Sequence, residues 1–180
     1  MKKALAGLLF MHLSLIPILN SGCGDVKTSS YFTPPKSKLD KYEGLEIFDF
    51  ETTIPDFPKD ALTKIPNDVE KILKTEKDSF KEVSRSTIEQ IPADKTLVLL
   101  GEVTSYIPGT DFTFESGAVK FGEVTISLKL ALVQKDSGQE ITTGEVSGFS
   151  SLGILRSGRL GKDMYEILAN EIVKFLSESY

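Results

Sequence analysis

The stretch EVTISLKLALVQKDSGQEITTGEVSGF, residues 123–149, has the clearest pattern in the sequence. Its first half alternates apolar with mostly polar residues, a period typical of a strand that is buried on one side. The apolar members are Val124, Ile126, Leu128, Leu130 and Leu132. Asp136 and Gly138 then supply turn chemistry, because aspartate can bond back to the backbone and glycine accepts positive φ. Since EITTGEVSGF returns as a second strand, the stretch predicts an antiparallel hairpin.

Three earlier segments also have strand character. LEIFDFETT at residues 45–53 alternates and is rich in aromatic and branched residues. FKEVSRST at 80–87 predicts a short strand anchored by Phe80 and Val83. KTLVLLGEVTSYIPG at 95–109 begins apolar on both sides, which is typical of a central strand.

Helical periodicity occurs in two places. In the segment 57–80, apolar residues recur on one helical face, and Pro58 suits an N-terminal turn. Pro66 lies inside that pattern and predicts a kink, or two helices that meet there. GKDMYEILANEIVKFLSESY at 161–180 predicts a final helix that packs across the sheet. The expected fold is α+β, with a mainly antiparallel sheet of about four to five strands and helices packed on one face. It forms a single domain over residues 43–180.

The N-terminal residues 1–22 have the layout of an export signal. Lys2 and Lys3 precede an apolar run at 4–19, which Pro17 interrupts near its end. A run of this length predicts a leader that is removed, and a retained N-terminal anchor is the alternative.

Cys23 is the sole cysteine of the chain, and Ser21 and Gly22 precede it. A lone cysteine forms no internal disulfide. The segment resembles the lipobox of bacterial lipoproteins, although Asn20 stands where leucine is usual and Leu19 is one place earlier. The resemblance implies that Cys23 receives palmitate-type acyl chains and anchors the protein to a membrane.

By the same resemblance, Gly24 after the cysteine implies the periplasmic face of the outer membrane, with the inner membrane or the cell surface as alternatives. Residues 23–42 are rich in Ser, Thr, Pro and Lys, which predicts a lipidated N-terminus followed by a flexible tether.

Composition excludes several functions for the mature chain. Removing the leader takes away Lys2, Lys3 and His12, which leaves 19 basic against 26 acidic residues, a formal net charge of −7 and no histidine. Imidazole-based nucleophilic catalysis and zinc sites therefore lack their groups. The acidic balance argues against nucleic acid as a partner. We expect no enzyme activity, no cofactor and no metal.

Carboxylate pairs are the catalytic class that composition leaves open. The acids considered are Asp49, Glu51, Glu102, Glu115, Glu123 and Glu145. No spacing in the sequence brings two of them together, so a solvated face is the expected role.

Two connections are candidate contact sites. Residues 106–122 carry Phe112 and Phe114 between glycines, and form either a hairpin tip that folds back or a loop that presents aromatic anchors to a protein partner. Residues 150–162 include Arg156 and Arg159, which could meet a phosphate, a lipid headgroup or an acidic partner. The alternative for the second loop is a strand-to-helix connection with solvated arginines.

The second half of the chain also resembles a known class. The shared features are Gly101 at the start of a strand, Pro108-Gly109 at its end, the long alternating strand, the turn at Asp136 and Gly138, and later glycines at 144 and 148. They resemble an uncharacterised family of bacterial envelope lipoproteins classed as a domain of unknown function. The layout is also similar to lipoprotein domains of the curli-secretion and penicillin-binding-protein-activator type. The resemblance implies a non-enzymatic adaptor that contacts an envelope protein.

The oligomeric state stays open. A second hypothesis is a lipid- or small-molecule-binding module, which would need an apolar pocket between the final helix and the face of the strand at 124–132.

Overall fold

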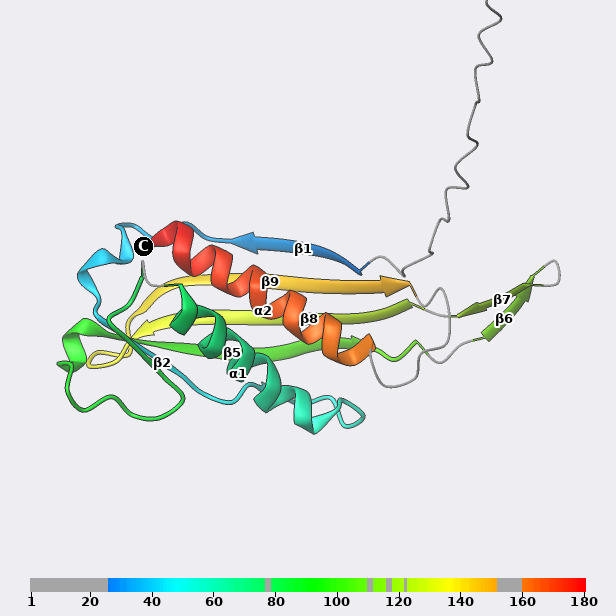
Figure 1. Cartoon of the computed structure of the whole chain (residues 1–180), viewed down its shortest axis with the longest axis horizontal. Coiled ribbons are helices and arrows are strands. Elements are labelled where there is room, and N and C mark those ends of the chain that lie inside the picture. Colours follow the sequence, from blue (N-terminus) through cyan, green and yellow to red (C-terminus); the bar gives the residue numbers. More distant parts are fainter. Residues whose placement is uncertain (1–25, 77–78, 110–111, 116–117, 122, 152–159) are drawn as a thin grey trace, which may run out of the picture.

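A mixed sheet organises the chain, and both helices lie on the same face of it (Figure 1). The computed structural model describes residues 26–76, 79–109, 112–115, 118–121, 123–151 and 160–180. Within them a seven-stranded sheet has the order β1-β9-β8-β5-β2-β4, and β3 also pairs with β5. The strands of this sheet are β1 (Val26–Phe32), β2 (Gly44–Ile47), β3 (Glu51–Thr52), β4 (Glu82–Ser84), β5 (Thr96–Ile107), β8 (Glu123–Gln134) and β9 (Glu140–Ser151). The helices are α1 (Lys59–Thr75) and α2 (Leu160–Ser179), with 3₁₀ turns η1 (Leu39–Lys41) and η2 (Ala93–Lys95).

The predicted hairpin is confirmed. β8 and β9 pair antiparallel along their length, and Gly138 in the turn has φ 65°. The alternating leucines and isoleucine of β8 are buried, with Leu128 fully so, and they face the helices. β5 is central, as predicted, because it lies between β8 and β2. The final helix is also confirmed, with Leu168 and Ile172 fully buried.

The expectation of four to five mainly antiparallel strands was wrong on two points. The sheet has more strands, and β2 pairs parallel with both β4 and β5, as β3 does with β5. α1 connects this part of the chain to β4, and a helical crossover of this kind returns the chain to the same end and makes the strands parallel. These strands contain two to four residues, too few to display a period.

The chain between β2 and β3 carries one extra residue. From Ile47 to Glu51 it advances four positions, while β5 advances three, from Leu99 to Glu102. As in a β-bulge, the extra residue reverses the alternation, so that residues two positions apart face opposite sides of the sheet. Phe50 therefore enters the core although it is two residues from exposed Phe48.

Two alternatives were predicted at Pro66, a kink or two helices that meet there, and the second is wrong because α1 continues as one helix across Pro66. Proline has no N–H for the carbonyl four residues earlier, that of Leu62. The backbone N–H of Phe50 donates to this carbonyl oxygen at 3.0 Å. A partner from outside the helix thus fills the position that the proline leaves open.

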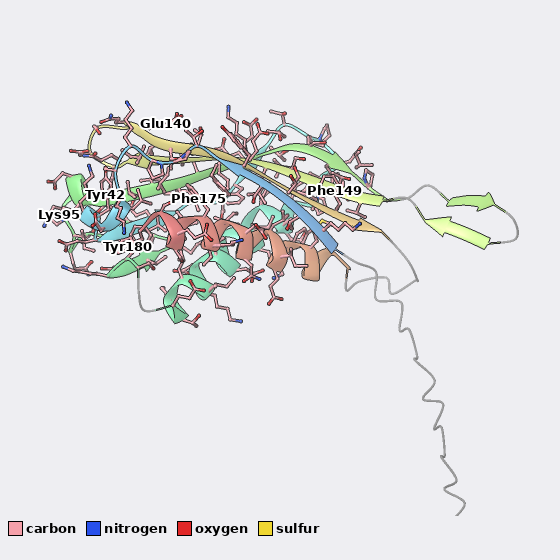
Figure 2. The ribbon with its side chains drawn as sticks, turned by 90° about the horizontal axis from the view of Figure 1, so that it is seen from above. Tyr42, Lys95, Glu140, Phe149, Phe175 and Tyr180 are labelled. Carbon is pink, nitrogen blue, oxygen red and sulfur yellow. The ribbon has the colours of Figure 1, made fainter. Side chains whose placement is uncertain are left out.

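The tether predicted for residues 23–42 was wrong from Val26 onward, and the domain begins there rather than at residue 43. β1 pairs antiparallel with β9 as an edge strand. Leu39 and Tyr42 are buried in the core, and the Tyr180 hydroxyl donates to the Tyr42 carbonyl at 3.3 Å (Figure 2). The segment was misread because its few apolar residues are widely spaced among Ser, Thr, Pro and Lys.

β1 is held against α2 on the helix side of the sheet. The Phe32 ring stacks on Phe175 at 3.8 Å between centroids, and both lie over Gly144 of β9. The hydroxyls of Thr28 and Ser30 donate to the Glu171 carboxylate, each at 3.2 Å. The void behind this stack, which Leu130, Leu132 and Ile172 also line, is about 10 Å³, about the least that a water molecule needs.

Candidate functional site: the uncovered face of the sheet

The face of the sheet opposite the helices is uncovered over its centre. We call it the open face, and it is formed by the residues of β1, β5, β8 and β9 that alternate with the buried ones, together with Phe48 and Glu51 from the chain after β2. The segment between β4 and η2 covers one end of it, where Ile88 is 2% exposed. Beyond that cover the surface is lined by charged and small polar residues with a few large apolar ones.

Charged residues form a row across the strands in the middle of the open face. Glu51 of β3 pairs with Glu102 of β5, which pairs with Lys129 of β8. Lys129 in turn pairs with Glu145 of β9, and Tyr31 of β1 follows. Cross-strand partners are about 5 Å apart, so one lysine stands between carboxylates on both sides. We call Glu51, Glu102, Lys129 and Glu145 the acidic row.

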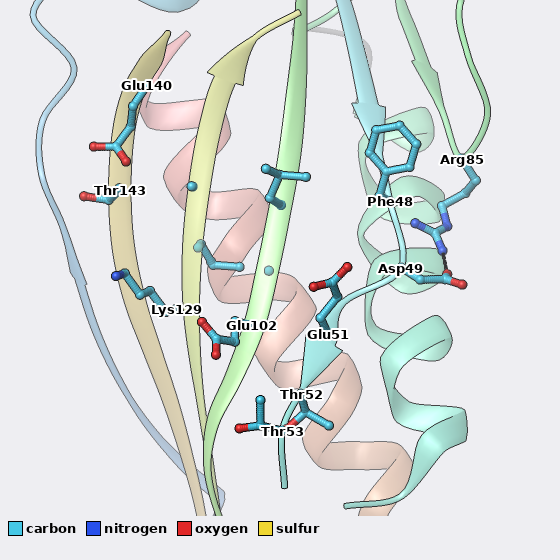
Figure 3. Close-up of a pocket in the computed structure, with 14 residues that line it drawn as sticks. Phe48, Asp49, Glu51, Thr52, Thr53, Arg85, Glu102, Lys129, Glu140 and Thr143 are labelled. Carbon is cyan, nitrogen blue, oxygen red and sulfur yellow. Dashed lines mark hydrogen bonds and ion pairs between the residues drawn. The ribbon is translucent and has the colours of Figure 1, made fainter. Parts of the chain in front are cut away.

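A hollow of about 750 Å³ lies over Glu51, Glu102 and Lys129 of the acidic row and the strands beside them (Figure 3). Asp49 and Glu140 add two further carboxylates to its lining. Phe48 and Leu100 add apolar surface, because 44% and 42% of these residues remain exposed. The lining therefore combines negative charge with exposed aromatic and aliphatic groups.

The second cation of the hollow, Arg85, is held by structural contacts. Its guanidinium donates to the Asp49 carboxylate and to the Ile47 carbonyl, and its Nε donates to Asn67 Oδ1 at 2.9 Å. The arginine therefore links β2, α1 and the segment after β4, and it neutralises Asp49. The exposed acids that remain in the lining are Glu51, Glu102 and Glu140, and the exposed cation Lys129 lies in the same lining.

A buried ion pair fixes the covered end of the open face. Glu46 of β2 is 2% exposed and accepts from the Lys135 ammonium at 2.6 Å and from the Ile88 N–H at 2.7 Å. Lys135 also donates to the Ile88 carbonyl at 3.2 Å. These bonds hold the covering segment against β2 and the β8–β9 turn, so this end is structural.

Two further rows continue toward the other end of the open face. The first consists of serines: Ser105, Ser127, Ser147 and Ser29. Within it the Ser127 and Ser147 hydroxyls are 2.9 Å apart and hydrogen-bonded. The second consists of Ile107, Thr125, Phe149 and Lys27. Ile107 is 55% exposed and Phe149 37% exposed, so we call this second row the apolar end row.

The predicted contact residues are placed only in part. Cys23, the leader 1–22, Arg156 and Arg159 lie outside the described residues. Phe112 and Phe114 belong to β6 (Phe112–Glu115), which pairs with β7 (Ala118–Phe121) in a separate two-stranded ribbon. This ribbon extends beyond the end of the main sheet (Figure 1). It does not contribute a strand to the open face.

The acidic row was missed by sequence reasoning, which found no spacing that brings acids together. Glu51 and Glu102 are far apart in the chain and become neighbours only through parallel pairing of β3 with β5. The available signal was the alternation of Lys129 and Glu145 with apolar residues in the hairpin.

The two glutamates of the acidic row that pair across β3 and β5, Glu51 and Glu102, are both exposed in the hollow. Among the described residues no group of three or more His, Cys, Asp or Glu is arranged to hold a metal ion. In the same part of the chain, no helix has the length and apolarity required to span a bilayer.

Comparisons with known proteins place the fold. No protein-family model matches the sequence, and no curated protein matches it significantly. Among solved structures, the PelC dodecamer from Paraburkholderia phytofirmans aligns with 84% of this chain and 96% of its own, at 15% identity and a TM-score of 0.54. A Xanthomonas campestris protein of the family DUF330 aligns with 82% of this chain and 91% of its own, at 8% identity and a TM-score of 0.52.

A minor lipoprotein from Acinetobacter baumannii aligns more loosely, over 76% of this chain and 94% of its own, at 11% identity and a TM-score of 0.47. Similarity at that level says nothing about function. At the identities of the two better matches, what the chain shares with PelC and the DUF330 protein is the fold.

Proposed function

We propose that this protein is a lipid-anchored, non-enzymatic binding module of the bacterial envelope, which holds a protein partner on its open face. Cys23 carries the lipid, and the periplasmic face of the outer membrane is the expected location. The leader, the small residues before the cysteine and the glycine after it support this part of the proposal.

The observation that carries the binding role is the acidic row with exposed Phe48 and Leu100 beside it. Isolated apolar side chains on a surface are ordinary, but here they border a hollow lined with carboxylates. Protein interfaces commonly combine aromatic anchors with a polar surround. Negative charge on this surface favours a partner that carries lysine or arginine, because complementary charge speeds and orients docking.

The alternative module for a lipid or small molecule is less well supported. It would need an apolar pocket between α2 and β8, and the side chains there are packed, with Leu128 and Leu168 fully buried. The void that Leu130, Leu132 and Ile172 line between β8 and α2 is about 10 Å³, far smaller than a ligand site.

Site-specific photocrosslinking in living cells tests the docking surface. A photoreactive residue at Thr143, which lines the hollow, should crosslink one envelope protein, whereas the same residue at exposed Lys71 on α1 should not. Glu51→Lys with Glu102→Lys should reduce the crosslink from position 143, because two carboxylates of the acidic row then become cations. No crosslink specific to position 143 in correctly localised protein would contradict the proposal.

The anchor is tested separately by mass and fractionation. The mature protein should begin at Cys23 with the mass of its acyl chains and should sediment with outer-membrane fragments, and Cys23→Ser should abolish both properties. PelC forms a dodecamer, so the crosslinked partner is also compared with the chain itself. Self-crosslinking through position 143 would make the partner a second copy.

A further inference from the structure

The distance from the proposed anchor to the folded domain is short. β1 begins at Val26, three residues after Cys23. Three residues span at most about 10 Å. If Cys23 is acylated, as proposed above, the end of the sheet where β1 begins must therefore lie against the bilayer.

The apolar end row lies at this same end. Lys27, the second residue of β1, pairs with Phe149, and Thr125 and Ile107 continue the row across β8 and β5. Figure 2 shows Phe149 toward this end and Tyr42 and Lys95 at the opposite one. The β8–β9 turn also lies at the opposite end, since a strand of 12 residues separates it from Glu123. That strand corresponds to about 40 Å.

The β6–β7 ribbon extends from this end as well, since it lies between Ile107 and Glu123 in the chain (Figure 1). Its register pairs Phe112 with Phe121 and Phe114 with Val119. The ribbon therefore continues the chain from the same end of the sheet as the apolar end row.

We propose that this end of the domain is a membrane-contact surface in addition to the lipid anchor. Ile107 and Phe149 lie in the interfacial layer, and Lys27 lies among the headgroups. An exposed apolar row with a flanking lysine is the composition that suits a lipid interface. The acidic row is four residues farther along β9, at Glu145, and remains in water for its partner.

For the test, the full chain is expressed with its own leader, so that processing and acylation can take place. The mature protein is then purified with its acyl chains and placed in phosphatidylethanolamine–phosphatidylglycerol vesicles. Thr125→Cys puts an environment-sensitive fluorophore within the apolar end row and leaves Ile107 and Phe149 intact. Ser137→Cys, in the exposed β8–β9 turn, is the matched control. Because acylation occupies the sulfur of Cys23, the new cysteine is the free thiol that takes the label.

The label at 125 should be quenched by a doxyl-labelled lipid and shielded from iodide in solution, and the label at 137 should show the reverse. Ile107→Ser with Phe149→Ser should remove most of the lipid quenching at 125 while the protein stays on the vesicles through its anchor. Equal iodide access at both positions would overturn the proposal. Shielding from iodide without lipid quenching would also overturn it, because a protein partner or second copy then covers the row.

Failure of the anchor gives a different result. In that case Cys23 keeps a free thiol and itself takes the label. A failed membrane contact is thereby separated from a failed lipidation.

Discussion

The backbone N–H of Phe50 donates to the Leu62 carbonyl oxygen, the acceptor that Pro66 leaves without a helical partner. This bond joins α1 to the parallel half of the sheet. It also marks the place where the chain turns Phe50 into the core and leaves Phe48 on the open face. The two phenylalanines therefore stand two positions apart with opposite roles.

Replacing each of these phenylalanines should separate the two roles. Phe50→Ala removes a ring that is 2% exposed and packs over Gly101, and should cost about 3–5 kcal/mol in the free energy of unfolding. Phe48→Ala should change stability by less than about 0.5 kcal/mol, and should weaken partner binding instead. Urea unfolding of both variants measures the difference, and similar losses from the two would contradict the assignment.

Gly144 is required for close packing of β1. A Cβ there would lie 2.0 Å from Cδ1 of Phe32, whose ring is backed by Phe175. Gly144→Ala should therefore cost about 1–3 kcal/mol and speed amide exchange along β1.

Gly148→Ala on the same strand is the control for this substitution. Its Cβ would meet the flexible side chains of Leu168 and Met164 at 3.3 Å, so a smaller loss is expected. Equal exchange rates along β1 in the two variants would show that the Phe32 stack does not hold the edge strand.

Glu43 should make stability depend on acid pH. Its carboxylate accepts from Lys81 at 2.8 Å and from Lys95 at 2.9 Å, and these hydrogen bonds lower the pKa of Glu43 to about 2 from its usual 4.5. Because the pKa is depressed in the folded state, Glu43 contributes to the free energy of unfolding above pH 4.5, and this contribution is lost as the pH falls toward 2.

Glu43→Gln should thus be less stable than the parent at neutral pH, and the two unfolding curves should converge near pH 2. Lys81→Gln with Lys95→Gln should reproduce this behaviour, since it removes the cause of the shift. If the difference in the free energy of unfolding between Glu43→Gln and the parent stayed constant from pH 7 to pH 2, the role of Glu43 would be contradicted.

The Glu46–Lys135 pair should show strong coupling. Lys135→Met leaves the buried Glu46 carboxylate without its cation, and such a loss costs about 3–5 kcal/mol. Glu46→Gln combined with Lys135→Met should recover part of the loss, because a glutamine carbonyl can still accept from the Ile88 N–H. A double-mutant cycle measures the coupling, and simple additivity of the two single changes would refute it.

Much of the antiparallel half of the fold follows from the sequence. The alternation of β8, the turn at Asp136 and Gly138, the apolar start of β5 and the helical face of α2 are local patterns, because burial on one side repeats every two or every three to four residues. Each of these elements is long enough to complete several periods. The expectation for Cys23 also comes from residues that adjoin it in the chain.

The parallel half, the edge strand and the open face were decided by tertiary structure. β2, β3 and β4 are too short to show a period, and β1 is held by Phe32 against Phe175 from the far end of the chain. The acidic row exists because pairing places Glu51, Glu102, Lys129 and Glu145 side by side across four strands. Periodicity reports which side of an element is buried, whereas pairing between strands depends on contacts that no local stretch contains.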